Sequence, residues 1–317
     1  IQFSGGLYLF NQAMILYGFG HANFKNHFYC YLYPRIVKNP DVFINNYFVS
    51  RYITRGVKNQ MEIDFSGIGF QNDWVYFQIG RGRESWGAGK DIQLALSENS
   101  NSYDYFMLGS DYGKLRVKYI HGFLESTNQG FNRYITARGI EWTNKASMIV
   151  GISESVIYSG LNRQLDLGYL NPIASHLELE INDRLYIHND NNSSNAVWQT
   201  HIDWLINNHL RFSFNYLIDE FVLDPDIEVN KENGTAYSMR IAFTAINSFD
   251  HILTIFISNV KVGTPTFRHM LGTNNFIQTN KPLGWSNGSD GKEIKIGINY
   301  FKLVTSFSGF ILHIYFG

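Results

Sequence analysis

The sequence predicts an all-β protein, an antiparallel transmembrane β-barrel of roughly 14–18 strands that forms a single domain over residues 1–317. Apolar and polar residues alternate with a period of two in many segments, which is the pattern of β-strands. Pieces rich in Asn, Gly, Ser and Asp separate these segments, and no strong helical period, internal repeat or linker interrupts them. Aromatic residues make up 16% and charged residues only 17% of the chain, which suits a sheet with one face in lipid.

The clearest alternation lies in five segments. In 210–220, Phe212 and Phe214 fall on one face, while Arg211 and Ser213 fall on the other. The same pattern marks 114–119, 197–206, 237–245 and 294–300. Weaker patterns predict strands near 60–69, 73–83, 91–98, 103–109, 132–142, 146–158, 251–262 and 309–316.

A soluble β-sandwich is the alternative, because its outer face would also be polar. The barrel is favoured because the polar faces carry charges of both signs, as a wet lumen would. Several segments reach about 9–11 residues, the length that crosses a bilayer at a tilt. Trp198 and Tyr216 lie near the ends of apolar faces, where membrane barrels carry aromatic girdles.

Composition narrows the classes of function. The net charge of −1 predicts no nucleic-acid partner. The single cysteine, Cys30, rules out an intrachain disulfide. The chain has no apolar run of 18 residues. Its first residues read as the middle of a strand, so we expect a mature form or a fragment.

The glycine-rich stretch RGRESWGAGKD at 81–91 first suggests a phosphate loop. It lacks the two glycines five apart that such a loop needs, and no βαβ unit surrounds it. We therefore interpret Gly87 and Gly89 as positions with unusual backbone angles, in a tight crossing at a barrel rim.

No catalytic or metal centre can be assembled from the sequence. His201 and Asp203 share a strand face, and we interpret them as hydrogen-bonded groups in the lumen. Asp219 and Glu220 point to opposite faces, so they cannot act together as acid and base on one sugar bond. Histidines 176, 188, 201 and 209 lack the spacing for one metal site on one element. We expect no enzyme activity and no cofactor.

The remaining candidate is a binding surface for an acidic polysaccharide, because arginine forks pair with carboxylates and aromatic rings cover sugar faces. A lattice of charges that only fills the barrel is the equal alternative. The candidate polysaccharide-binding residues are Arg81, Arg83, Trp86, Arg116, Lys118, His201, Arg211 and Arg240.

The two arginines near this stretch pose a topological question. By strict alternation, Arg81 and Arg83 share the apolar face of their strand. Either the strand leaves the bilayer before Arg81, or a bulge near Gly80 or Gly82 turns both side chains inward. We expect the inward orientation.

The run GRGRESWGAGKDIQLALSEN at 80–99 resembles the capsule-assembly Wzi family of outer-membrane proteins, although Ala88 replaces that family's usual proline. Stretches at 103–125, 133–160, 165–174 and 214–225 continue the resemblance in the same order, so it covers 80–225. The residues that match the family's motifs, and that we interpret as structural, are Trp86, Gly87, Gly89, Ser97, Asn99, Glu154, Asn171, Pro172, Asp219 and Glu220.

The resemblance implies a barrel in the bacterial outer membrane that binds and retains capsular or other exopolysaccharide, as a lectin and not as an enzyme. It implies outer-membrane lipid or lipopolysaccharide, polysaccharide and other envelope proteins as partners. Members of the family are typically longer than this chain. The alternatives are a diffusion porin, a barrel enzyme, and a scaffold barrel in a larger secretion or motility complex.

Overall fold

The computed structural model describes residues 1–10, 13–39, 59–127, 129–181, 193–220, 234–248, 250–302 and 306–316. Fifteen strands form one antiparallel sheet, in which each strand is hydrogen-bonded to the next one along the chain. Their bounds are β1 (Gln2–Phe10), β2 (Ala13–Phe24), β3 (Phe28–Lys38), β4 (Asn59–Gln71), β5 (Val75–Gly82), β6 (Tyr103–Tyr112), β7 (Leu115–Leu124), β8 (Phe131–Thr143), β9 (Met148–Leu161), β10 (Ser193–Asn207), β11 (Leu210–Glu220), β12 (Gly234–Asn247), β13 (His251–Val262), β16 (Gly291–Lys302) and β17 (Ser306–Phe316).

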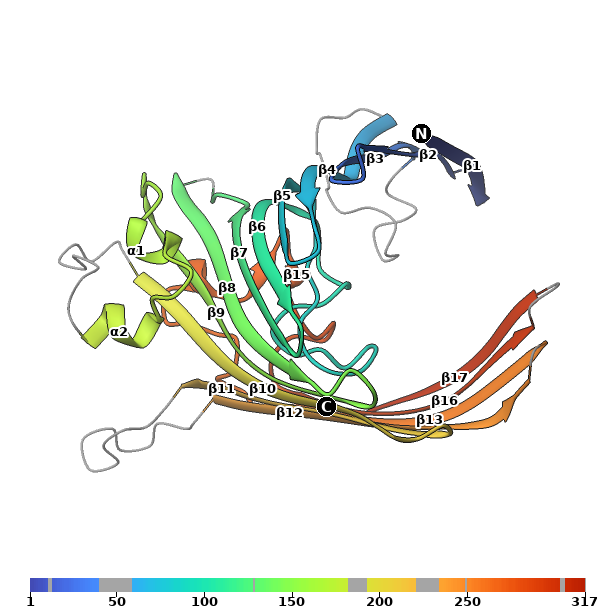
Figure 1. Cartoon of the computed structure of the whole chain (residues 1–317). Helices are drawn as coiled ribbons and strands as arrows, with labels where there is room; N and C mark the ends of the chain where they lie inside the picture. The colour runs from blue at the N-terminus through green and yellow to red at the C-terminus, as the bar shows by residue number, and fades with distance from the viewer. Residues whose placement is uncertain are drawn as a thin grey trace, which may run out of the picture.

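The sheet is strongly curved and wraps around a hollow (Figure 1). Its order begins at β1 and ends at β17, and these two strands are not paired with each other in the described residues. Short turns join the strands at one end, for example at 113–114 and 208–209, and long segments such as 83–102 and 263–290 join them at the other. In transmembrane barrels the short turns face the periplasm and the long loops face outward.

Short helical elements and a small hairpin complete the described structure. They are α1 (Leu167–Leu170), α2 (His176–Ile181), the 3₁₀ turn η2 (Gly272–Asn274), β14 (Ile277–Gln278) and β15 (Lys281–Pro282). Among the described residues, no helix has both the length and the apolar character needed to cross a bilayer.

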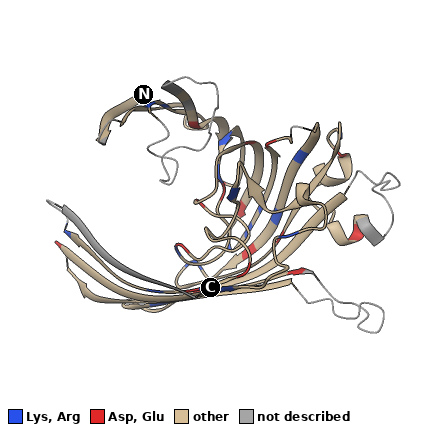
Figure 2. Cartoon of the chain, turned by 180° about the vertical axis from the view of Figure 1, so that it is seen from behind, with Lys and Arg blue, Asp and Glu red and all other residues tan. Residues whose placement is uncertain are grey.

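The predicted alternation is confirmed in β11. Tyr216 is 38% exposed on the outward face, whereas Ser213 and Asn215 are buried on the inward face. Neighbouring strands keep this register, because Asn215 pairs with His201 of β10 and with Ser238 of β12. Figure 2 shows that most positions along the strands are uncharged. The outward faces therefore present an apolar surface suited to lipid.

The predicted strand at 91–98 is wrong. Residues 83–102 leave β5, turn into the hollow of the sheet and pair only through an isolated bridge between Trp86 and Leu96. Leu94 and Leu96 are fully buried there. Their apolar alternation reflects packing inside the barrel and not a strand in its wall.

A second segment, 263–290, packs against the first inside the sheet. The Trp285 amide donates to the Leu94 carbonyl at 3.1 Å, and the Ser97 amide donates to the Leu283 carbonyl at 2.8 Å. A Cβ on Gly284 would lie 1.6 Å from the Leu94 carbonyl oxygen, so only glycine fits. We call residues 83–102 and 263–290 together the plug.

Candidate functional site

Charged side chains line the inward face of the strands just below the plug, toward the short-turn end. The strand register brings them together: Arg116 of β7 lies opposite Glu141 of β8, and Gly151 of β9 separates Glu141 from His201 of β10. We call this set the inner charged band. Its members are Asp111, Arg116, Lys118, Glu141, His201, Asp203, Arg211 and Arg240.

A cavity of about 380 Å³ lies between the plug and one part of this band. It falls in the size range of small-molecule sites. Plug and wall both contribute to it, with Tyr76, Ser85, Trp86, Gly87, Ser110, Asp111, Arg116, Val117, Lys118, Gly139 and Glu141 as its lining. The structure therefore joins three of the predicted binding residues, Trp86, Arg116 and Lys118, in one cavity.

Lys118 connects the wall to the plug. Its Nζ lies 2.6 Å from the Glu84 carboxylate and 5.4 Å from the centre of the Trp86 ring. Trp86 is only 5% exposed. A Cβ on Gly139 would lie 2.4 Å from this ring, so the glycine gives the indole its place against the wall. Ion pair and cation–π contact together fix the aromatic surface of the cavity.

Arg116 is the most accessible cation of the cavity. Its side chain is 43% exposed, and its Nε donates to Asp111 at 3.1 Å. Ion pairs this exposed contribute little to stability, which leaves the guanidinium able to exchange its partner for a ligand.

The other predicted lumen groups have separate partners. His201 Nε2 lies 3.1 Å from Glu141 Oε1, and a Cβ on Gly151 would lie 2.3 Å from the imidazole ring. Asp203 instead binds Arg211 through two hydrogen bonds. His201 and Asp203 are thus hydrogen-bonded groups of the lumen, as predicted, but each bonds a different strand.

Arg240 belongs to the contact between wall and plug. Its guanidinium donates to the Lys90 carbonyl at 3.0 Å and lies 3.7 Å above the Phe256 ring. The Asp91 carboxylate is 4.0 Å away. Because Arg240 is only 8% exposed, its role here is to hold the plug.

The inward orientation expected for Arg81 is wrong. Its strand pairs with both neighbours in unbroken register, so the side chain stays on the outward face, where both Asp104 oxygens accept from it at 3.1 Å. Arg83 lies beyond the strand end and forms an ion pair with Asp64, which also contacts Arg35. Neither arginine lines the cavity.

The glycines of the motif have the unusual backbone angles that we predicted. Gly87 has φ 110° and Gly89 has φ 75°. They lie within the plug and not in a rim crossing. Asn215 of the wall holds this turn, since it accepts from the Ala88 amide at 2.7 Å and donates to the Ala88 carbonyl at 3.0 Å.

The remaining motif residues make structural contacts. The Ser97 hydroxyl donates to the Gly284 carbonyl, and the Asn99 amide donates to Ser97 Oγ at 3.2 Å. Asp219 accepts from the Phe267 amide. The side chain of Glu220 lies outside the described residues.

Glu154, Asn171 and Pro172 meet on the outward face of the sheet, away from the cavity. Glu154 forms an ion pair with Arg138 at 3.3 Å, and Arg138 donates to the Asn171 carbonyl at 3.1 Å. Pro172 lies beside them as part of the lining of a larger groove.

Sequence reasoning missed the carboxylates that pair with the predicted cations. Glu84, Asp111 and Glu141 become partners only through the plug and the register of β6 to β10. For Asp111 and Glu141, the inward phase in the alternation was the available signal; Glu84 lies in the plug, where no alternation marks it. Within the described ranges, no three His, Cys, Asp or Glu side chains group as a metal site.

Comparison with known proteins supports the fold. No protein-family model matches the chain, and no curated protein matches it in sequence. Among solved structures, Wzi from Escherichia coli, described as an outer-membrane protein of group 1 capsule assembly and a carbohydrate-binding β-barrel, superposes with a TM-score of 0.65 at 9% identity. The match covers 94% of this chain and 65% of that one, so this chain spans about two thirds of the Wzi length.

The chain has the fold of a bacterial outer-membrane β-barrel. The prediction of an antiparallel transmembrane barrel is therefore confirmed, in line with its apolar outward faces. OmpT, an outer-membrane protein of Vibrio cholerae, matches with a TM-score of 0.49 at 9% identity, over 99% of this chain and 86% of that one. The anion-selective porin of Comamonas acidovorans matches with a TM-score of 0.41 at 8% identity, over 91% of this chain and 88% of that one. Scores this low carry no argument about function.

Proposed function

We propose that this outer-membrane barrel binds polysaccharide in its lumen without transforming it, and retains capsular or other exopolysaccharide at the cell envelope. The observation that carries the proposal is the cavity that joins Trp86, Arg116 and Lys118. The motif resemblance at 80–225 and the structural likeness to the carbohydrate-binding Wzi barrel support a place in the same capsule-assembly group.

The chemistry of the cavity suits a glycan with acidic groups. Arg116 offers a guanidinium fork to a carboxylate, and the Trp86 and Tyr76 rings supply apolar surface beside it. The cations are already paired with the protein's own carboxylates. An acidic glycan therefore has to exchange partners with them, so its binding weakens as salt is raised.

The plug favours this function over diffusion. Residues from both plug segments, such as Leu94 and Leu283, form one buried core with inward-facing wall residues, such as Ile135 and Val197. This core occupies part of the hollow of the sheet, which supports a binding role over free diffusion. Single-channel recording in planar bilayers tests this point, and we expect little steady conductance. A stable open channel would favour the porin.

Arg116→Ala tests the binding site directly. Loss of one charge-assisted contact should weaken binding of the producing organism's acidic surface polysaccharide about tenfold. Arg81→Ala is the matched control, because Arg81 is also paired and strand-borne but points outward. We would measure binding by titration calorimetry on folded protein. Equal affinities for wild type and Arg116→Ala would remove the cavity from the proposal.

A further inference from the structure

A row of inward-facing residues crosses β12, β13 and β16 at a place where the wall contacts the plug. Arg240, which donates to the Lys90 carbonyl, pairs in register with Ser258, and Ser258 pairs with Lys295. We call Arg240, Ser258 and Lys295 the lumen row. All three residues are buried, with exposed fractions of 8%, 2% and 7%. Opposed residues on neighbouring strands have Cβ atoms about 4.5–5.5 Å apart, so the three side chains share one part of the lumen.

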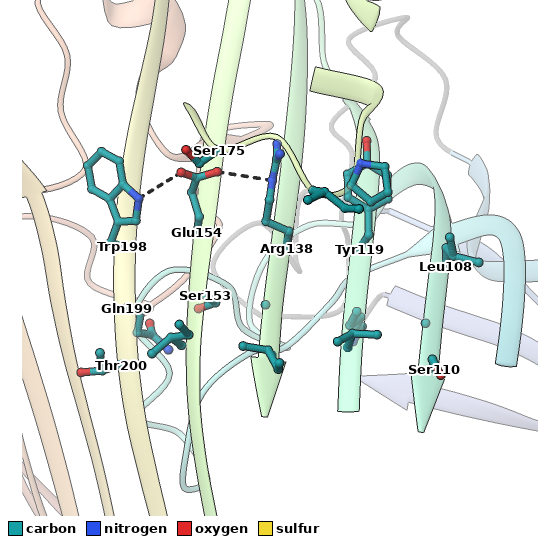
Figure 3. Close-up of a pocket in the computed structure, with 18 of the residues that line it drawn as sticks. Leu108, Ser110, Tyr119, Arg138, Ser153, Glu154, Ser175, Trp198, Gln199 and Thr200 are labelled. Carbon is teal, nitrogen blue, oxygen red and sulfur yellow. Dashed lines mark hydrogen bonds and ion pairs between the residues drawn. The ribbon is translucent and has the colours of Figure 1, made fainter. Parts of the chain in front are cut away.

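Lys295 lacks the kind of partner that other cations of the wall have. Arg138 pairs with the Glu154 carboxylate at 3.3 Å (Figure 3), and Lys118 pairs with Glu84 at 2.6 Å. In the part of the chain that the structure describes, no carboxylate, carbonyl or hydroxyl accepts from the Lys295 ammonium group. Withdrawing an ammonium group from water is costly unless a negative group pairs with it. Lys295 therefore needs a partner that the protein does not supply.

The hydroxyl of Ser258 is a second donor without an acceptor. Its Oγ is buried and has no hydrogen-bond partner among the described residues. The neighbouring serine at the same level of the wall differs, because the Ser213 hydroxyl donates to Asp203 Oδ1 at 2.9 Å. A hydroxyl and an ammonium group thus lie buried on adjacent strands, and both lack the acceptor that buried donors require. This pair of donors is suited to binding an anion.

Two carboxylates lie near the lumen row, and neither pairs with Lys295. Asp91 of the plug lies 4.0 Å from Arg240. Glu293 is the next inward-facing residue along β16 and has an interaction of its own, but no ion pair joins it to Lys295 within the described residues. One ammonium group therefore remains without a direct negative contact, and one singly charged anion is enough to supply it.

We propose that Lys295 and Ser258 bind a halide ion, chloride under physiological conditions, beside Arg240. An ammonium group offers three donors and a hydroxyl offers one, so both can point at a spherical anion. Because Lys295 is only 7% exposed, a monoatomic ion suits the site better than phosphate or a sugar acid. The bound ion then stabilises the wall where Arg240 holds the plug. The inference concerns an inorganic ion and does not depend on glycan binding in the cavity.

Urea unfolding of the folded chain in detergent tests the site. The midpoint is measured at rising sodium chloride, while sodium gluconate, which has a larger anion, keeps the ionic strength constant. A ligand that binds only the folded state raises the midpoint once its concentration passes the Kd, so wild type should show a rise that depends on chloride. Lys295→Met removes the charge but keeps the length of the side chain, and it should lower the chloride affinity at least about tenfold.

Lys292→Met is the matched control, because Lys292 lies on the same strand but is exposed on its outward face. This control should keep the response of wild type. Equal chloride dependence in wild type and Lys295→Met would overturn the proposal. A parallel series with sodium phosphate tests the class of anion, and a rise with phosphate but not with chloride would overturn the assignment to a halide.

Crystals grown in sodium bromide locate the ion directly, because bromide scatters X-rays anomalously. We expect an anomalous peak within hydrogen-bond distance of Lys295 Nζ and Ser258 Oγ, and we expect this peak to disappear in Lys295→Met. That variant should still fold, since replacing a buried charge by an apolar side chain of similar size is often neutral or stabilising. Wild-type crystals without a bromide peak at these two atoms would overturn the proposal.

Discussion

Asn215 is a wall residue that holds the plug directly. It is completely buried and bonds both the amide and the carbonyl of Ala88. Its amide group also donates to the Ile92 carbonyl at 3.3 Å and to Ser238 Oγ at 2.9 Å. Asn215→Ala removes all four contacts at once.

The expected loss of plug stability follows from the buried polar groups that lose Asn215 as a hydrogen-bond partner. The Ile92 carbonyl keeps a second donor, since the Ser238 hydroxyl lies 2.6 Å away. The amide and carbonyl of Ala88 lose the partners that Asn215 gave them. Each orphaned buried group costs about 1–3 kcal/mol, so the variant should weaken plug docking by about 2–6 kcal/mol, less where water enters.

Urea unfolding in detergent and single-channel recording together measure this effect. We expect a lower midpoint for Asn215→Ala and, where the plug is released before the wall unfolds, more frequent channel openings. Asn299→Ala is the control, because Asn299 lies on the inward face of β16 and no hydrogen bond joins it to the plug in the described residues. An unfolding free energy within about 0.5 kcal/mol of wild type, with unchanged conductance, would refute this view of the plug.

Three further substitutions probe the packing of the plug and the burial of two arginines in the wall. Gly284→Ala places a Cβ 1.6 Å from the Leu94 carbonyl oxygen, so we expect a loss of at least about 3 kcal/mol on urea unfolding, and a fully stable variant would contradict the close approach. Arg138→Met breaks the buried ion pair with Glu154 and should lower the free energy of unfolding by about 3–5 kcal/mol. The Arg211 side chain is 57% exposed, so Arg211→Ala should lower that free energy by at most about 1 kcal/mol. Equal losses for these two arginines in the same unfolding assay would contradict the burial assigned to Arg138.

The wall of the barrel was predictable because alternation is a local property. Phe212, Ser213 and their neighbours show their faces in sequence, and the register of β11 with β10 keeps them. The plug was not predictable in this way. Leu94 and Leu96 alternate as strand residues do, but they are buried by a segment almost 190 residues later in the chain, as in the bond from Ser97 to Gly284.

The site was predictable in part for the same reason. Arg116 and Lys118 have the inward phase of β7, so their place in the lumen could be read from the alternation. Arg81 has the outward phase and follows it, and the expected bulge does not occur because Asp104 on the next strand pairs with the charge. The partnership of Lys118 with Glu84 depends on the path of the plug, which no local pattern describes.

The central claim is that the barrel retains polysaccharide through its lumen cavity. Its most direct test deletes the gene in the producing bacterium, restores it as wild type or as Arg116→Ala, and measures cell-associated and released polysaccharide. We predict that deletion shifts polymer from the cells to the medium, that wild type reverses this, and that Arg116→Ala reverses it only partly. Unchanged retention of polymer after deletion would contradict the account.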